Sequence, residues 1–147
     1  KLLMVGDGPE REACEALCRS KGIAEKVMFL GNSNEIDKIL CFSDLFILPS
    51  EKESFGLAAL EAMASGVPVI SSNTGGLSEV NVHGKSGYLS NVGNIEEMAN
   101  NALSILKDPI VLQQFKKQAK QEAQKFDTKN IVPIYEEMYE KALDRIS

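Results

Sequence analysis

The chain has no tryptophan, one histidine and three cysteines in its 147 residues. The histidine, His83, stands in a short turn without a carboxylate cluster beside it, which disfavours a metal site. The cysteines, Cys14, Cys18 and Cys41, form neither a C-x-x-C pair nor an even disulfide set. We therefore expect reduced thiols in the core or half-buried, no metal ligands, and a cytoplasmic location.

Positive charge and long apolar runs are also scarce. Lys and Arg number 16 against 21 Asp and Glu, and this net charge of −5 disfavours nucleic acid as a partner. No apolar run approaches the roughly 20 residues that span a bilayer, and no secretory signal opens the chain, so we expect no transmembrane segment. The chain starts inside an apolar run without an initiator methionine, and we expect a fragment of a longer protein.

The composition is that of a globular domain, with 44% hydrophobic and 25% charged residues. Short apolar runs alternate with helical stretches, and this alternation predicts an α/β fold in one domain over 1–147, a Rossmann-like parallel sheet flanked by helices. The expected strands are 2–5, 27–30, 45–48 and 69–71, and the expected early helices are 10–21 and 35–42.

The region after residue 89 is predicted to be helical. One apolar stripe runs from Ile95 to Leu106 and is expected to end at Asp108-Pro109. A second, strongly amphipathic helix is expected over 131–146.

Two glycine patterns have competing interpretations. Gly6 and Gly8 resemble a dinucleotide loop, but the third glycine of G-x-G-x-x-G would fall at Arg11, so a plain turn is favoured. Gly75-Gly76 either permits a tight strand-to-helix turn, which is favoured, or cradles a phosphate.

The most informative pattern is a pair of glutamates, Glu53 and Glu61, with seven residues between them. Every other residue from Leu57 to Ala64 is Ala, Leu or Met, and a helix that is apolar all round is normally buried on all sides. Glu61 is therefore predicted to be a buried carboxylate that needs a partner. The alternative is a solvated loop acid at Glu53 and a Glu61 that faces solvent from a partly buried helix.

The start of this helix is predicted to bind an anion. Gly56 leaves the first backbone N–H groups uncovered, Ser54 can cap the helix, and unpaired N–H donors and the helix dipole both attract negative charge. Glu61 follows roughly 10 Å further along the axis. This spacing suits a ligand with phosphate at one end and hydroxyls at the other, such as a nucleotide sugar.

These residues resemble the retaining GT-B glycosyltransferases of family 4, also called glycosyl transferases group 1. The motif extends from Glu53-Ser54-Phe55-Gly56-Leu57 to Glu61-Ala62-Met63-Ala64 and Gly66-x-Pro68-Val69. Further matches include Val5-Gly6-Asp7-Gly8-Pro9, Gly75-Gly76-x-x-Glu79-Val80 and His83-Gly84-x-x-Gly87-Tyr88-Leu89. The resemblance implies the C-terminal, nucleotide-sugar-binding half of a GT-B fold, whose N-terminal acceptor domain is absent from this chain.

The resemblance also implies the role of each site residue. Glu61 would accept hydrogen bonds from the ribose hydroxyls, and Glu53, as the catalytic residue, would hold hydroxyls of the donor sugar. The remaining donor contacts would be the backbone near the sugar and diphosphate at Ser54, Phe55, Gly56 and Leu57, and the backbone near the base at Gly31 and Asn32.

The implied reaction is retaining transfer from a nucleotide sugar by a front-face route, without an enzymic nucleophile, a cofactor or a metal ion. The family's basic diphosphate ligands would lie upstream of Lys1. The stretch from Ser50 to Leu57 looks most like the N-acetylglucosaminyl malate synthases of bacillithiol synthesis, which would make the donor UDP-GlcNAc and the acceptor L-malate.

Three alternatives stay open at this point. The chain could be a non-catalytic nucleotide-sugar-binding or interaction module, or part of a GT-B nucleotide-sugar epimerase. The amphipathic helix over 131–146 could pack on this domain or, as the resemblance implies, cross to the N-terminal domain.

Overall fold

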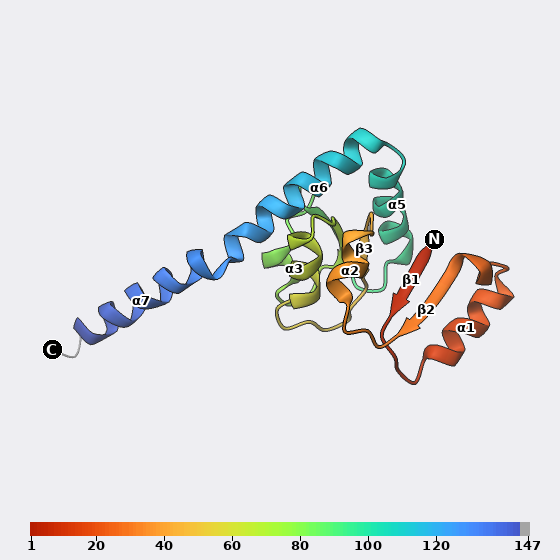
Figure 1. Cartoon of the computed structure of the whole chain (residues 1–147), viewed down its shortest axis with the longest axis horizontal. Helices are drawn as coiled ribbons and strands as arrows, with labels where there is room; N and C mark the ends of the chain where they lie inside the picture. Colours follow the sequence, from red (N-terminus) through yellow and green to blue (C-terminus); the bar gives the residue numbers. More distant parts are fainter. Residues whose placement is uncertain (145–147) are drawn as a thin grey trace. The chain divides into compact units, whose positions relative to one another are not determined.

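The computed structural model describes residues 1–144, which fall into two compact units (Figure 1). Unit 1 is Lys1–Ile36, and unit 2 begins at Asp37. The single domain over 1–147 stays a prediction.

Unit 1 is a parallel strand pair with one helix. Strands β1 (Leu2–Val5) and β2 (Val27–Gly31) pair in parallel, and α1 (Arg11–Ser20) and the 3₁₀ turn η1 (Ala24–Lys26) connect them. A parallel pair needs such a crossover, because a tight turn cannot bring the chain back to the same end. The predicted strands and helix of this unit are confirmed within two residues.

Unit 2 contains a three-stranded parallel sheet in the order β3-β4-β5. Its strands are β3 (Phe46–Leu48), β4 (Val69–Ser72) and β5 (Gly87–Ser90). The helical elements are α2 (Ile36–Cys41, which starts at the unit boundary), α3 (Leu57–Ala64), α4 (Leu77–Val80), α5 (Ile95–Leu106), α6 (Pro109–Ala123), the 3₁₀ turn η2 (Gln124–Phe126) and α7 (Thr128–Asp144).

The core of unit 2 lies where the central strand meets α5 and α6. All four residues of β4 are buried, as expected for a central parallel strand covered on both faces. The core cluster consists of Ile70, Met98, Ala102, Ile105 and Phe115. Helix α3 packs against α6, β3 and β4.

Each unit has its own parallel strand pairing, β1-β2 in unit 1 and β3-β4-β5 in unit 2. In the described residues, β1 pairs only with β2, and β3 pairs only with β4. Alternation along the sequence predicts parallel strands, but it does not state which strands are neighbours.

Asp108-Pro109 begins a helix, whereas the sequence predicted that it would only end one. The Asp108 carboxylate accepts a hydrogen bond from the Ile110 N–H at 2.8 Å, and Pro109 takes the first position of α6. An Asp-Pro pair is a stop for one helix and a start for the next, because proline lacks the N–H that the first helical position does not use.

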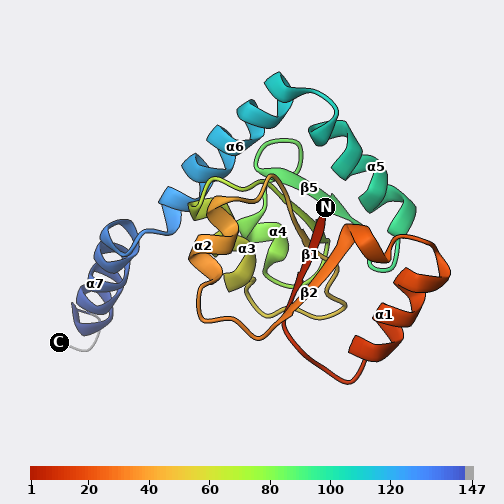
Figure 2. The same cartoon turned by 45° about the vertical axis from the view of Figure 1, so that its right-hand side comes forward.

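Helix α7 confirms the predicted amphipathic helix, although Ile146 lies outside the described residues. None of its described residues is buried, and it extends away from α3 and α5 in both views (Figures 1 and 2). The structure therefore contradicts packing of this helix on the core of unit 2. Crossing to another domain stays a prediction.

Two further expectations concern the burial of the three cysteines and the presence of a transmembrane segment. Cys14 and Cys18 are half-buried, as expected, but Cys41 is exposed, because the short α2 buries only its neighbour Leu40. None of the helices described in residues 1–144 is long and apolar enough to cross a membrane.

Candidate functional site

The predicted site lies around the first turn of α3 and the loop before it, residues 51–56 (the 51–56 loop). Gly56 precedes the helix with φ +96°, a left-handed conformation that favours glycine, and no side chain of residues 1–144 caps the first N–H groups. Ser54 is thus not the helix cap that the sequence suggested, because the helix starts at Leu57. The uncapped N–H groups remain available to an anion.

Glu61 is exposed, and the prediction of a carboxylate buried on all sides is wrong. Only Ala59, Ala62 and Met63 of α3 are buried, so the helix packs along one face. In the described part of the chain, no hydrogen bond or ion pair holds the Glu61 carboxylate. Alanine is small enough to occur at the surface as well as in the core, so an alanine-rich helix can look fully buried from its sequence.

The exposed face of α3 connects the helix start with Glu61. Leu57 is 65% exposed and lies one turn before Glu61, roughly 6 Å along the axis. Glu61 lies on the same exposed face as Leu57, so its carboxylate is accessible to a ligand that contacts the start of the helix. Glu61 thus lies one turn from the helix start, rather than the two turns expected from the sequence, and a ligand that contacts both stays a prediction.

Glu53 is half-buried in the 51–56 loop. Its carboxylate accepts a hydrogen bond from the N–H of Ser54 at 3.0 Å. This contact directs the Glu53 side chain toward the backbone of its own loop, close to the helix start. Three residues, Ser54 to Gly56, separate Glu53 from α3, the helix that carries Glu61. All three belong to the predicted set of donor contacts.

A turn that the sequence did not assign to the site packs against the 51–56 loop. Residues 74–77, which follow β4 and include Leu77 at the start of α4, form the 74–77 turn. A Cβ atom added to Gly75 would lie 1.7 Å from the carbonyl oxygen of Glu53, and one added to Gly76 would lie 2.7 Å from the Cα of Phe55. The favoured interpretation of Gly75-Gly76 as a tight strand-to-helix turn is confirmed.

A buried polar network lies behind the 74–77 turn. Asn81, which follows α4, donates hydrogen bonds to the carbonyl oxygen of Val69 and to the Ser71 hydroxyl, each at 3.1 Å. Its own side-chain oxygen accepts a hydrogen bond from the Ser86 hydroxyl at 3.0 Å. Because Asn81, Ser71 and Ser86 are fully buried, this network fixes the end of α4 on the central strand.

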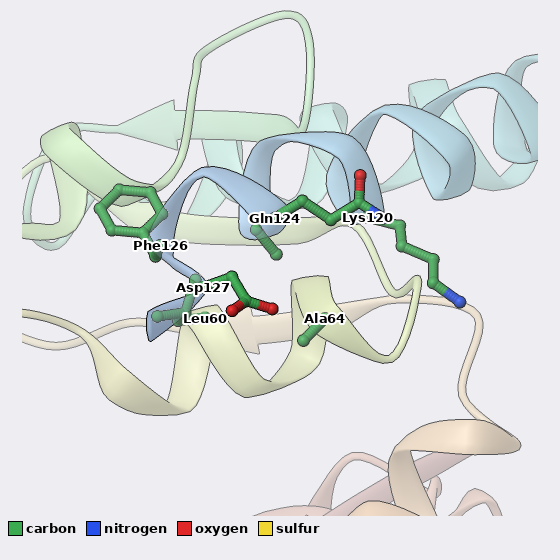
Figure 3. A pocket seen from close by; sticks show the side chains of 7 residues that line it. Leu60, Ala64, Lys120, Gln124, Phe126 and Asp127 are labelled. Atoms are coloured by element: carbon green, nitrogen blue, oxygen red, sulfur yellow. The ribbon is translucent and has the colours of Figure 1, made fainter. Parts of the chain in front are cut away.

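Phe55 connects the 51–56 loop to the segment before α7. Its ring meets the ring of Phe126 edge-to-face, with centroids 6.0 Å apart. Phe126 also lines a cavity of about 240 Å³ between α3 and α6–η2, and the Asp127 carboxylate points into it (Figure 3). Leu60 is on the α3 wall of this cavity, but no predicted donor contact lines it, so the cavity is separate from the predicted site.

Gly31 and Asn32 lie in unit 1, whereas the other predicted contacts lie in unit 2. Gly31 ends β2 with φ +68°, and Asn32 follows it, exposed. Their contact with the base stays a prediction. Within residues 1–144, no three His, Cys, Asp or Glu side chains gather as a possible metal site.

The family is established by comparison with known proteins. The family model described as "Glycosyl transferases group 1" matches residues 1–122. The chain belongs to the glycosyl transferases group 1 family. This result confirms the resemblance drawn from the two glutamates and the glycine that precedes the helix.

Proteins similar to this group 1 chain include named enzymes and a protein whose structure was solved in complex with UDP. N-acetyl-alpha-D-glucosaminyl L-malate synthase of Bacillus anthracis is 43% identical over 140 residues, which are 95% of this chain and 37% of that protein. The structure of sucrose-phosphate synthase from Thermosynechococcus elongatus matches with a TM-score of 0.85 at 28% identity, over 98% of this chain and 39% of that one. The structure of Anabaena Alr3699/HepE in complex with UDP matches with a TM-score of 0.81 at 29% identity, over 97% of this chain and 40% of that one.

These comparisons confirm the fold class, parallel sheets flanked by helices as in the GT-B glycosyltransferases. The chain spans less than half the length of each of these relatives.

Proposed function

We propose that this chain is the C-terminal, donor-binding half of a retaining glycosyltransferase that transfers a sugar from a UDP-sugar. The observation that carries the proposal is helix α3, whose first N–H groups have no side-chain cap in the described residues and whose exposed face carries the unpaired Glu61 carboxylate one turn after Leu57. Membership in the group 1 family and the UDP complex of a relative with 29% identity support it.

In this proposal each part of the site binds one part of the donor. The N–H groups from Ser54 to Leu57 stabilise the diphosphate, whose negative charge grows as the glycosidic bond breaks. Glu61 accepts hydrogen bonds from the ribose hydroxyls. Glu53, the catalytic residue of the proposal, releases the N–H of Ser54 and accepts hydrogen bonds from hydroxyls of the sugar. Gly31 and Asn32 receive the base.

The rest of the full-length protein would supply the remaining functions. An N-terminal domain would hold the acceptor, and basic residues outside this chain would neutralise the diphosphate. The leaving diphosphate would help to deprotonate the acceptor, so no enzymic nucleophile and no divalent ion is required. The 43% identity to the Bacillus anthracis relative makes UDP-GlcNAc the first donor and L-malate the first acceptor to test.

The proposal is tested by calorimetry on the full-length protein with UDP and UDP-GlcNAc. Glu61→Gln keeps the size of the side chain and removes its charge, so UDP affinity should fall about 10-fold, as expected for charge-assisted hydrogen bonds. Glu96→Gln is the matched control, because Glu96 is an exposed glutamate on α5, outside the proposed site. Equal UDP affinity in all three proteins would contradict the proposed role of Glu61.

Turnover in the presence of a chelator distinguishes the alternatives. Transfer of GlcNAc to L-malate with retention at the anomeric carbon is the expected product. Binding of UDP-GlcNAc without turnover by any acceptor would instead favour the non-catalytic module. Conversion of the UDP-sugar without an acceptor would favour the epimerase.

A further inference from the structure

We propose that the 74–77 turn is a positioning element of the donor site: the backbone of Gly75 and Gly76 sets the shape of the 51–56 loop, and donor affinity depends on this contact. The inference rests on the proposed function, because the 51–56 loop is the segment that would meet the donor. It gives a role to residues that make no contact with the donor in that proposal.

The two backbones are in direct contact along three residues of the loop. A Cβ on Gly76 would lie 2.7 Å from the carbonyl oxygen of Ser54 and 2.9 Å from that of Phe55, and one on Gly75 would meet the carbonyl oxygen of Glu53. These neighbours are backbone atoms, which cannot rotate away as the end of a side chain can. Any side chain at position 75 or 76 must therefore displace the loop.

Two further contacts join the same elements. The Thr74 hydroxyl donates a hydrogen bond to the carbonyl oxygen of Glu51 at 3.2 Å, at the start of the loop. At the other end, a Cβ on Gly56 would lie 2.7 Å from Cδ2 of Leu77, which is fully buried. The turn thus contacts the loop from its first residue to the residue that precedes α3.

The turn is rigid enough to act as a template. Leu77 and Val80 of α4 are buried, and Asn81 holds the end of α4 on β4 through buried hydrogen bonds. The loop itself has few internal hydrogen bonds, of which the Glu53 to Ser54 contact is one. A loop held against a buried turn presents its N–H groups in one arrangement, which lowers the entropy lost on binding.

The best test is Gly76→Ala in the full-length protein. Gly76 has φ −70° and ψ −6°, a conformation that alanine adopts without strain, so any effect comes from the clash with the loop. The matched control is Gly8→Ala, because Gly8 also has no left-handed φ and a Cβ there meets no atom of the described residues within 4 Å. Thr74→Val is a milder second variant, which removes one hydrogen bond and keeps the shape of the side chain.

We expect Gly76→Ala to raise the Kd for UDP and the KM for the donor by at least about 10-fold, and Thr74→Val to raise both by about 3-fold. The KM for the acceptor should stay unchanged. Gly8→Ala should keep the wild-type Kd for UDP and the wild-type KM for the donor. A purely structural role would lower the folded fraction but leave the Kd of the folded protein as it was.

The outcomes separate this inference from the proposed function. If the wild type binds no UDP, the proposed function fails first. If the wild type binds UDP and folded Gly76→Ala binds it equally well, the positioning role is overturned. Should Gly76→Ala fail to fold, Thr74→Val decides, and wild-type affinity in that variant would overturn the role.

Discussion

At the scale of single residues, Glu122 is a buried carboxylate held by two lysines. It is only 3% exposed, and it forms ion pairs with Lys125 of η2 and, at 2.7 Å, with Lys85 of the loop before β5. Hydrogen bonds from Lys125 and then from Lys85 lower the pKa of Glu122 below its ordinary value, against the opposing effect of burial. The carboxylate thereby connects the end of α6 to the loop before β5.

This pKa shift predicts how the stability of α6 depends on pH. Because the folded pKa lies below the ordinary value of 4.5, ionised Glu122 stabilises the fold above pH 4.5, and this contribution is lost as the pH falls through the folded pKa. We expect Glu122→Gln to destabilise α6 by about 1–2 kcal/mol at pH 7, since both lysines are partly exposed.

Hydrogen exchange of the α6 amides at pH 7 and in acid measures this effect. The variant should exchange faster than the wild type at pH 7, and the difference should shrink below pH 4.5. Glu137→Gln is the control, because Glu137 pairs with Lys141 on exposed α7. A difference that stayed constant with pH would argue against the ion pairs as its cause.

At the scale of elements, the start of α6 depends on one cap. Asp108 accepts the Ile110 N–H, and Pro109 presets the backbone of the first turn. We expect Asp108→Ala to destabilise the helix by about 1 kcal/mol, whereas Asp108→Asn, which keeps an acceptor oxygen, should change it by only a few tenths of a kcal/mol. Exchange of the amides at the start of α6 reports the difference, and equal rates in both variants would show that the cap contributes nothing.

The elements were predictable to the extent that their signals are local. Short apolar runs predicted β1 to β4, a proline before and a glycine after the helix predicted α1, and the spacing of apolar residues predicted α5 and α7. Helix α2 was also predicted. Strand β5 was missed: it begins at Gly87, where a Cβ would lie 1.8 Å from the carbonyl oxygen of Val69. A glycine in a strand looks like a turn in the sequence, and only the neighbouring strand explains it.

At the scale of the whole molecule, α7 exposes a row of large apolar side chains, of the kind that globular proteins normally cover. Tyr135 is 54% exposed and Met138 is 60% exposed. If this face packs on another domain in the full-length protein, as the resemblance implies, introducing charged side chains on it should strongly destabilise the full-length protein. If it faces water, they should change stability by less than about 0.5 kcal/mol.

We expect the double variant Tyr135→Glu and Met138→Glu to lower the melting temperature of the full-length protein by several degrees and to reduce glycosyl transfer. The control is Glu136→Gln with Glu140→Gln, a pair of changes at exposed positions of the same helix. A double glutamate variant with wild-type melting temperature and activity would show that the apolar face of α7 is not covered.

The sequence was sufficient for the family, the α/β class and the glutamate motif, because these depend on residue types at fixed local spacings. Only the tertiary structure decided that Glu61 is exposed and that Gly75-Gly76 touches the backbone from Glu53 to Phe55. Both depend on which surfaces meet in space, and contacts between residues some 20 positions apart leave no periodic trace along the chain.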